Sequence, residues 1–171
     1  MTNTTIRRAR PADAETLSAL GRLTFSQTFE HLYPPTDLSS FLAKAYSTEK
    51  MKAELLDPAT AVWLAEAAGE AIGYAVAGPC TLPHPETTSD CGELKRLYLR
   101  QDRRGGGVGT TLMSTSLDWL ERVGRRRIWI GVWSGNDGAQ RLYERQGFAK
   151  VGEYGFKVGQ TTDLEFILRR G

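Results

Sequence analysis

The 171-residue sequence is poor in the residues that build metal centres and disulfide frameworks. It has two cysteines and two histidines, and Cys80 and Cys91 lie neither at a Cys-x-x-Cys spacing nor beside a histidine. Zinc sites need closely spaced ligands, and small domains held together by disulfides carry more cysteines than this. The sequence therefore predicts no bound metal, and its cysteine content is typical of a reduced protein of the cytoplasm.

Long apolar runs and an excess of one charge are also absent. No stretch approaches the roughly 18 apolar residues that a membrane-spanning helix needs, and the polar residues Met1 to Thr5 lack the apolar core of a signal peptide. The 22 Lys and Arg residues nearly balance the 20 Asp and Glu residues. We therefore expect neither a membrane nor a nucleic acid as a partner, and we interpret Arg125-Arg126-Arg127 as a solvated surface segment.

What the sequence does have is an ordinary globular composition, with 40% hydrophobic and 25% charged residues. Because there is no long linker and no repeat, residues 1–171 are expected to form a single domain. The residue patterns predict strands at 6–10, 61–67, 71–78, 93–100, 127–133, 148–158 and 163–169, and helices at 11–29, 38–46, 48–56, 110–123 and 136–146. We expect Gly69-Glu70 to form the turn of a hairpin, Ser47 to be the N-cap of the helix at 48–56, and Pro34-Pro35 to stop the first helix. The strand–helix–strand order of the second half predicts a mixed α/β (α+β) fold.

Glycine is abundant, with 18 residues, and three of them are consecutive in Arg103-Arg104-Gly105-Gly106-Gly107-Val108-Gly109-Thr110. This segment joins a predicted strand to a predicted helix, where free N–H groups and the helix dipole can hold a phosphate. It is not a Walker A loop, because no Gly-Lys-Ser/Thr follows, and it is not Gly-x-Gly-x-x-Gly, because Thr110 replaces the third glycine. A flexible turn without a ligand is the alternative, and the two arginines favour a phosphate.

The glycine-rich segment is the first of two segments that form a recognisable pair. Arg104-Gly-Gly-Gly-Val-Gly109 is followed by Asn136-x-x-Ala139-x-x-x-Tyr143-x-x-x-Gly147-Phe148. The first is similar to the Arg/Gln-x-x-Gly-x-Gly/Ala signature for acetyl-CoA of the GNAT superfamily of N-acetyltransferases, and the second resembles that family's next motif. Ile6 to Asp13 also resembles the family's first strand and helix, so the resemblance spans essentially the whole chain. It implies a mixed central sheet of about six to seven strands, helices on both faces, and a V-shaped splay between the fourth and fifth strands.

The resemblance also implies a reaction, in which acetyl-CoA gives its acetyl group directly to a primary amine. The pantetheine arm would pair with Leu97, Tyr98 and Leu99, and the Leu97 N–H would polarise the acetyl carbonyl. Asn136 would hydrogen-bond the pantetheine amides. The residues expected around the pyrophosphate are Arg104, Gly105, Gly106, Gly107, Val108, Gly109 and Thr110.

Two side chains are the expected catalysts of this acyltransferase. The resemblance gives Tyr143 the task of protonating the departing CoA thiolate, and Glu93 that of taking a proton from the amine, directly or through water. The alternatives are a partly buried core tyrosine and a solvated surface glutamate. Cys91 has no histidine beside it in the sequence, which argues against a covalent acetyl-cysteine route. Trp129 and Trp133 alternate with apolar residues in a predicted strand, so we expect them in the core.

The acceptor amine is less closely defined. Thr24 to Phe29, Ala45 to Glu49 and Ile128 to Trp133 resemble the PaiA-like branch, which is named for a polyamine N-acetyltransferase. A polyamine such as spermidine or spermine would need carboxylates near its entrance. The candidates for these carboxylates are Glu30, Asp37 and Glu49. An antibiotic, an amino acid or a protein N-terminus are alternative acceptors, and a non-catalytic acetyl-CoA sensor would not require Tyr143. Strand edges near the C-terminus also make a homodimer an expectation.

Overall fold

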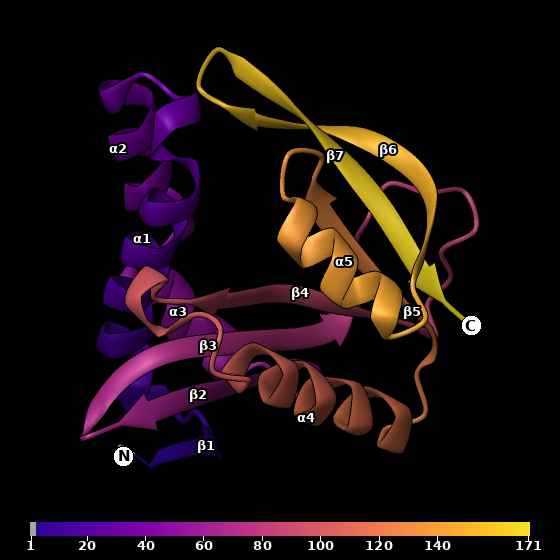
Figure 1. Cartoon of the computed structure of the whole chain (residues 1–171), viewed down its shortest axis with the longest axis horizontal. Coiled ribbons are helices and arrows are strands. Elements are labelled where there is room, and N and C mark those ends of the chain that lie inside the picture. Colours follow the sequence, from indigo (N-terminus) through magenta and orange to yellow (C-terminus); the bar gives the residue numbers. More distant parts are fainter. Residues whose placement is uncertain (1–2) are drawn as a thin grey trace.

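The computed structural model describes residues 3–171, which form one sheet with helices packed around it (Figure 1). The seven strands of this segment lie in the order β1-β2-β3-β4-β5-β7-β6, and every neighbouring pair is antiparallel except the parallel pair β4 and β5. Their bounds are β1 Thr4–Arg8, β2 Ala61–Ala67, β3 Glu70–Pro79, β4 Cys91–Leu99, β5 Arg126–Trp133, β6 Ala149–Val158 and β7 Thr161–Arg170. The predicted mixed α/β architecture is confirmed.

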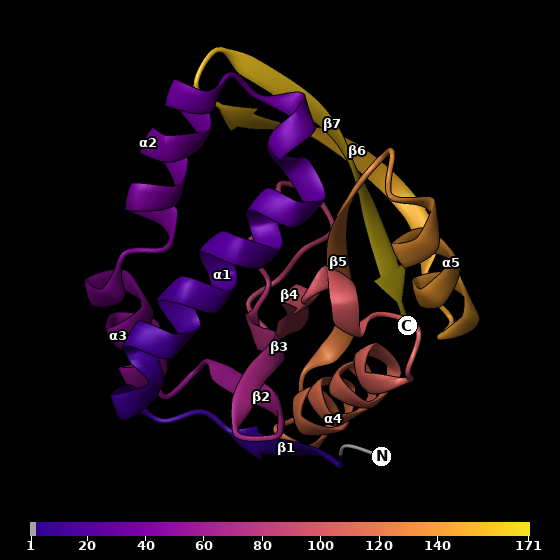
Figure 2. The same cartoon turned by 60° about the vertical axis from the view of Figure 1, so that its left-hand side comes forward.

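The helices of the described segment cover both faces of this sheet. Their bounds are α1 Ala14–Phe29, α2 Pro35–Ala45, α3 Thr48–Leu56, α4 Val108–Arg122 and α5 Asp137–Arg145. Figure 2 shows α1, α2 and α3 on one side and α4 and α5 on the other. Strand β2 contacts both layers, because Val62 and Leu64 pack in the cluster that contains the apolar residues of α1, whereas Trp63 and Ala65 pack with those of α4. A strand buried on both faces alternates its side chains in this way.

Two local predictions are confirmed by the geometry of the chain. The Ser47 hydroxyl oxygen accepts a hydrogen bond from the Lys50 N–H at 3.1 Å, so Ser47 is the N-cap of α3. The β2–β3 hairpin is confirmed, and its tight turn is formed by Ala68 and Gly69, with φ of 51° and 78°, one residue earlier than the predicted Gly69-Glu70. Both features follow from local sequence, which explains why they could be predicted.

The prolines of the first helical region act differently from the prediction that they stop the first helix. Helix α1 already ends at Phe29, and a short 3-10 turn, Glu30–Leu32, follows it. Pro35 is instead the first residue of α2, a position where its missing N–H costs nothing and its fixed φ suits the helix. Strand β1 lies two residues earlier than predicted, and α4 begins two residues earlier, at Val108.

The pairing of β4 and β5 is short and determines where an opening can form. In register, Cys91 pairs with Arg126, Gly92 with Ile128, and Glu93 with Trp129, and no pair follows. Strand β5 then stays paired with β7, and β4 with β3. The two strands therefore diverge beyond Glu93, which confirms the V-shaped splay between the fourth and fifth strands (Figure 1).

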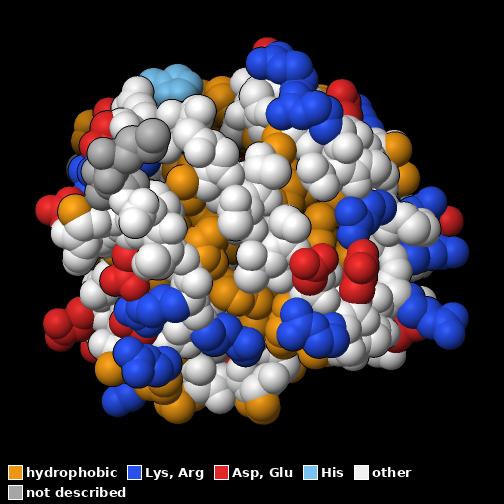
Figure 3. All heavy atoms as spheres, turned by 60° about the horizontal axis from the view of Figure 1, so that its bottom comes forward, with side chains coloured by type: hydrophobic (Ala, Val, Ile, Leu, Met, Phe, Trp, Pro, Cys, Tyr) orange, Lys and Arg blue, Asp and Glu red, His pale blue; other side chains and the backbone are white. Residues whose placement is uncertain are grey.

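Charges of both signs are mixed on the face shown in Figure 3, where Lys and Arg side chains stand among Asp and Glu side chains and hydrophobic side chains are visible between them. This mixture agrees with the net charge of +2. None of the helices in residues 3–171 has the length and apolar character required to cross a bilayer.

Candidate active site

A cavity of about 750 Å³ lies between the diverging strands β4 and β5, and we call it the β4–β5 cavity. Its walls also include the N-terminal end of α4, one side of α5 along its whole length and the end of α1. The predicted site residues that line it are Leu97, Tyr98, Leu99, Arg104, Gly105, Gly107, Gly109, Thr110, Asn136 and Tyr143. Gly106, Val108 and Glu93 do not line it. The glycine-rich segment and the segment that contains Asn136 and Tyr143 thus meet at one cavity.

The open edge of β4 offers backbone N–H groups to this cavity. The Arg100 N–H donates to the Ile72 carbonyl of β3 at 2.8 Å, in register with the β3–β4 ladder. Because N–H groups alternate between the two edges of a strand, those of Leu97 and Leu99 are directed away from β3 and toward the gap. A chain of amides lying in the gap could therefore pair with β4 as an added strand would.

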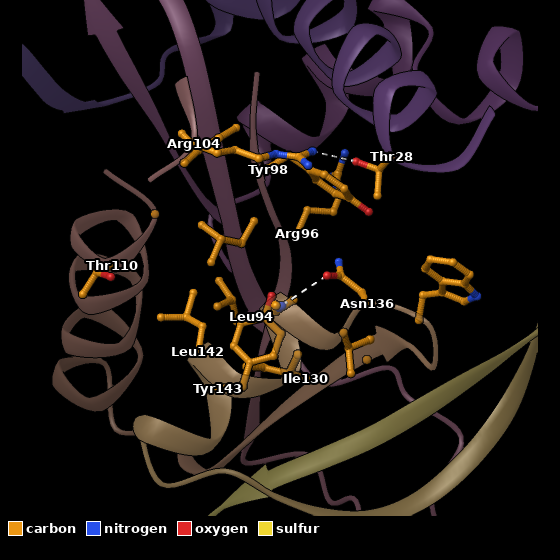
Figure 4. Close-up of a pocket in the computed structure, with 18 of the residues that line it drawn as sticks. Thr28, Leu94, Arg96, Tyr98, Arg104, Thr110, Ile130, Asn136, Leu142 and Tyr143 are labelled. Atoms are coloured by element: carbon orange, nitrogen blue, oxygen red, sulfur yellow. Dashed lines mark hydrogen bonds between the residues drawn. The ribbon is translucent and has the colours of Figure 1, made fainter. Parts of the chain in front are cut away.

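The glycine-rich segment bends tightly at the N-terminus of α4. Gly105 and Gly107 have φ of 85° and 84°, a left-handed conformation in which a side chain is strained. Gly106 does not share this conformation. The Arg104 guanidinium donates to the Thr28 hydroxyl oxygen at 3.1 Å and so ties the segment to α1 (Figure 4). The cationic Arg104 and the first N–H groups of α4 together favour an anion at this end of the cavity.

Asn136 has a structural role at the start of α5. Its side-chain oxygen accepts a hydrogen bond from the Ala139 N–H at 3.1 Å, so Asn136 is the N-cap of α5. Because the oxygen is already bonded to its own helix, the side-chain NH₂ group is the part that can bind a ligand, as a donor to a carbonyl.

Tyr143 lies on the α5 wall of the cavity, beside Leu142 and near Ile130, across from Tyr98 and Arg96 (Figure 4). The residue is 7% exposed, and burial raises the pKa of its hydroxyl to about 12. The hydroxyl is therefore protonated at neutral pH and can act as a proton donor.

The predicted base Glu93 is held outside the cavity. Its carboxylate accepts a hydrogen bond from the Thr81 N–H at 2.9 Å and lies 3.5 Å from the Lys95 ammonium group. The structure therefore places Glu93 near the 80–90 loop and does not bring it to the same cavity as Tyr143. Three carboxylates were predicted to bind a polyamine. Glu30, Asp37 and Glu49 line neither this cavity nor the second cavity that adjoins it.

A second cavity, of about 480 Å³, lies between the α1–α3 layer and strands β4, β6 and β7, and we call it the aromatic cavity. Its eight aromatic lining residues are Phe25, Phe29, Tyr33, Phe41, Tyr46, Tyr98, Tyr154 and Phe156. The residues that line both cavities are Phe29, Lys95, Arg96, Tyr98, Gly131 and Glu165. The two cavities therefore adjoin each other at the splay of the sheet.

Most charged groups of the aromatic cavity are paired. The Arg96 guanidinium bonds the Glu54 carboxylate and lies over the rings of Tyr46 and Tyr74, 5.8 and 5.9 Å from their centroids. Lys50 and Lys95 add positive charge to the lining. The Arg96–Glu54 pair joins β4 to α3 and fixes one wall of the cavity.

Glu165 of β7 is the functional candidate that the sequence did not reveal. The residue is only 9% exposed, and burial, with a smaller contribution from the negative charge of Asp163, raises the pKa of its carboxyl to about 7. In the sequence, Glu165 alternates with the apolar residues Leu164 and Phe166, which suggests a solvated face. The structure shows the reverse, with Leu164 46% exposed and Glu165 buried. The one available signal was that Glu165 shares its strand face with Ile167.

Comparison with known proteins agrees with this geometry. A family model described as the acetyltransferase (GNAT) family matches residues 25–148. An uncharacterized N-acetyltransferase of Mycobacterium bovis is 30% identical over 92% of this chain and 97% of its own length, and one of Lactobacillus delbrueckii subsp. lactis, from the pepI 3′ region, is 26% identical over 99% and 98%.

Among solved structures, the PaiA N-acetyltransferase of Thermoplasma acidophilum in complex with coenzyme A superimposes with a TM-score of 0.78, at 22% identity, over 98% of each chain. At that identity the likeness shows the fold alone. The family model covers the glycine-rich segment, Asn136 and Tyr143, and the relatives match nearly the full length. The chain therefore belongs to the acetyltransferase (GNAT) family, and acetyl-CoA is its acetyl donor.

Proposed function

We propose that the protein transfers the acetyl group from acetyl-CoA in the β4–β5 cavity to a primary amine in the aromatic cavity. The main support for this proposal is that the two cavities share lining residues, because a ligand bound in one cavity can then contact a ligand bound in the other. Holding both reactants in contact supplies much of the rate enhancement of a two-substrate transfer.

The donor would lie along the splayed strand. The pantetheine amides pair with the free edge of β4, the Leu97 N–H polarises the acetyl carbonyl, and the Asn136 NH₂ group donates to a pantetheine carbonyl. The pyrophosphate lies at the N-terminus of α4 beside Arg104. Gly106 and Val108 belong to this segment without lining the cavity.

The transfer needs a proton for the leaving group. The amine nitrogen attacks the thioester carbonyl, the C–S bond breaks, and the CoA thiolate takes a proton from the Tyr143 hydroxyl. The buried and protonated state of Tyr143 supports this role. The predicted role of Glu93 as base has less support, because its carboxylate bonds Thr81 and lines neither cavity.

Two acceptor classes are proposed. A polyamine such as spermidine or spermine is the class that the resemblance to the PaiA-like branch suggests. The cavity itself favours an amine with a single ammonium group and an apolar or aromatic body. Eight aromatic residues line the cavity, and Arg96 and Lys95 are already paired with Glu54 and Glu93, so Glu165 is the one carboxylate of the lining without a cationic partner among residues 3–171. A polyamine would place several positive charges against this lining.

An amine panel that follows CoA release tests the proposal. The panel holds spermidine, spermine, 2-phenylethylamine, an aminoglycoside, free amino acids and short peptides with free N-termini. Turnover of any of these amines is the expected result, and the ranking separates the two acceptor classes. Tight binding of acetyl-CoA with no turnover of any amine would contradict the proposal and would favour an acetyl-CoA sensor.

A homodimer is proposed on separate grounds. Strand β6 is the last strand of the sheet, so one of its edges is not paired within residues 3–171. Such an edge can pair with a second copy of the chain. Light scattering during size-exclusion chromatography is expected to give twice the mass of the chain, and a monomer mass would contradict this.

A further inference from the structure

Glu165 lies where the two cavities adjoin. On β7 it is in register with Trp133 of β5 on one side and with Tyr154 of β6 on the other. Glu165 lines both the β4–β5 cavity and the aromatic cavity. No other carboxylate in residues 3–171 lines both. Glu165 is therefore the carboxylate available where an amine in the aromatic cavity would adjoin a ligand in the β4–β5 cavity.

The carboxylate of Glu165 is also without a compensating partner. Its raised pKa has two causes, burial and the nearby charge of Asp163, and no hydrogen bond from the described residues opposes them. Burying a carboxylate in this way is costly, so such groups concentrate at functional sites. A bound ammonium group would supply the missing partner.

The groups that face Glu165 come from its own strand, β7, and from the three strands β4, β5 and β6. On β7, Asp163 accepts a hydrogen bond from the hydroxyl of Tyr33, which follows the 3-10 turn after α1. On β6, Tyr154 has a pKa raised by burial and by the negative charges of Glu165 and Glu93. The groups of β4 that share the cavity lining with Glu165 are Lys95, Arg96 and Tyr98. From β5, the uncharged Trp133 stands opposite in register. The Arg96 guanidinium forms an ion pair with the Glu54 carboxylate, so its positive charge does not neutralise the Glu165 carboxylate.

We propose that Glu165 is the general base of the transfer and takes the proton from the acceptor amine at the meeting point of the two cavities. This assignment rests on the function proposed above. It replaces Glu93 in that role, because a base must come within hydrogen-bond reach of the amine, directly or through one water.

The protons of the step balance with Glu165, Tyr143 and solvent. Glu165 takes one proton from the ammonium group, which frees the nitrogen lone pair to form the C–N bond. The C–S bond breaks, and the Tyr143 hydroxyl gives its proton to the CoA sulfur. The nitrogen loses a second proton to solvent, Tyr143 regains one from solvent, and Glu165 releases its proton. The net products are the acetamide, CoA and one proton.

The pH profile of kcat/KM for the best amine of the panel tests this assignment. Glu165 must be ionised to accept a proton, so the wild-type value should rise with pH and level off above the carboxyl pKa of about 7. Glu165→Gln removes the base and keeps the shape. We expect it to lower kcat/KM by about 100-fold at about pH 8 and to abolish the rise centred near neutral pH.

Two matched variants separate this role from a general effect of losing a carboxylate. Glu153→Gln changes an exposed residue of β6 that pairs with Lys150 and is expected to leave rate and profile unchanged. Glu93→Gln is expected to keep the rise near pH 7. Unchanged CoA affinity, measured by calorimetry, shows that each variant is folded. If Glu165→Gln lost CoA binding, Glu165→Asp would decide, since it should recover part of the rate together with the rise.

The outcomes of these measurements distinguish the assignment of Glu165 from the proposed function. If the wild type acetylates an amine and Glu165→Gln keeps its rate and its pH profile, the assignment of Glu165 fails and the proposed function stands. Loss of the rise in Glu93→Gln, or a flat profile in Glu165→Asp, would also overturn it. If the wild type acetylates no amine, both proposals fail.

Discussion

The two cavities of this protein are built in different ways. The β4–β5 cavity is lined largely by the edge of β4, a glycine-rich turn, the start of α4 and one side of α5, and the turn and the helix start are backbone features that a short motif can specify. The aromatic cavity is lined by side chains from α1 to β7 that come from positions 25 to 165. A ligand common to a whole family can be recognised by backbone geometry, whereas the particular amine is recognised by side chains. Substitutions in one cavity should therefore change the KM of one substrate.

The largest effect is expected where both substrates react. Tyr143→Phe removes the hydroxyl and keeps the ring, so kcat should fall about 100-fold while CoA affinity changes little. Steady-state kinetics and calorimetry measure the two quantities. Tyr74→Phe is the matched control, because Tyr74 is fully buried and lines neither cavity, and it should keep kcat. An unchanged kcat in Tyr143→Phe would remove Tyr143 from the acid role.

An intermediate effect is expected in the aromatic cavity. Phe41 lines only this cavity, against Phe156, with ring centroids 5.7 Å apart. Phe41→Leu removes an aromatic face that can contact the ammonium group or body of the amine, so the amine KM should rise about 5-fold to 10-fold. The KM of acetyl-CoA should stay the same. Phe166→Leu, outside both cavities, should change neither KM. A rise in the KM of acetyl-CoA alone would contradict the division of the two cavities.

The smallest effect is expected at the glycine-rich turn. Gly107 has φ of 84°, and alanine in this conformation costs about 1–2 kcal/mol. Gly107→Ala should lower stability by about that amount and raise the KM of acetyl-CoA about threefold, with no change in the amine KM. Gly106→Ala, where the backbone is ordinary and no atom lies within 4 Å of the added carbon, is the control. Equal effects of both variants would show that the left-handed conformation of Gly107 does not cause the loss of stability or the higher KM of acetyl-CoA.

The features predicted from the sequence are those that a few neighbouring residues determine. Ser47 caps α3 because its hydroxyl meets an N–H three residues later, and the glycine-rich segment turns where Gly105 and Gly107 permit a left-handed backbone. The V-shaped splay of the sheet was implied by the family resemblance, since no local pattern marks the last paired residue, Glu93. Pro35 shows the limit of local signals, because proline can begin a helix as well as end one.

The acceptor side could not be predicted in the same way. Strand alternation suggests a buried Leu164 and an exposed Glu165, but the structure has Leu164 exposed and Glu165 buried. The reason is that β7 lies between β5 and β6, and the aromatic cavity lies against the face of β7 that carries Glu165. Glu30, Asp37 and Glu49 lie in a helical region whose sequence does not indicate which side faces the sheet. The structure instead brings Glu54 and Glu165 to the cavity lining. These positions depend on contacts between segments more than 100 residues apart, which short motifs do not encode.

The most direct test is a crystal structure of the protein with CoA and its best amine bound together. The expected structure has the pantetheine arm in the gap between β4 and β5, the CoA sulfur within hydrogen-bond distance of the Tyr143 hydroxyl, and the amine nitrogen next to Glu165. Two results would contradict this account. One is pantetheine bound outside the gap, and the other is an amine that approaches the CoA sulfur without occupying the aromatic cavity.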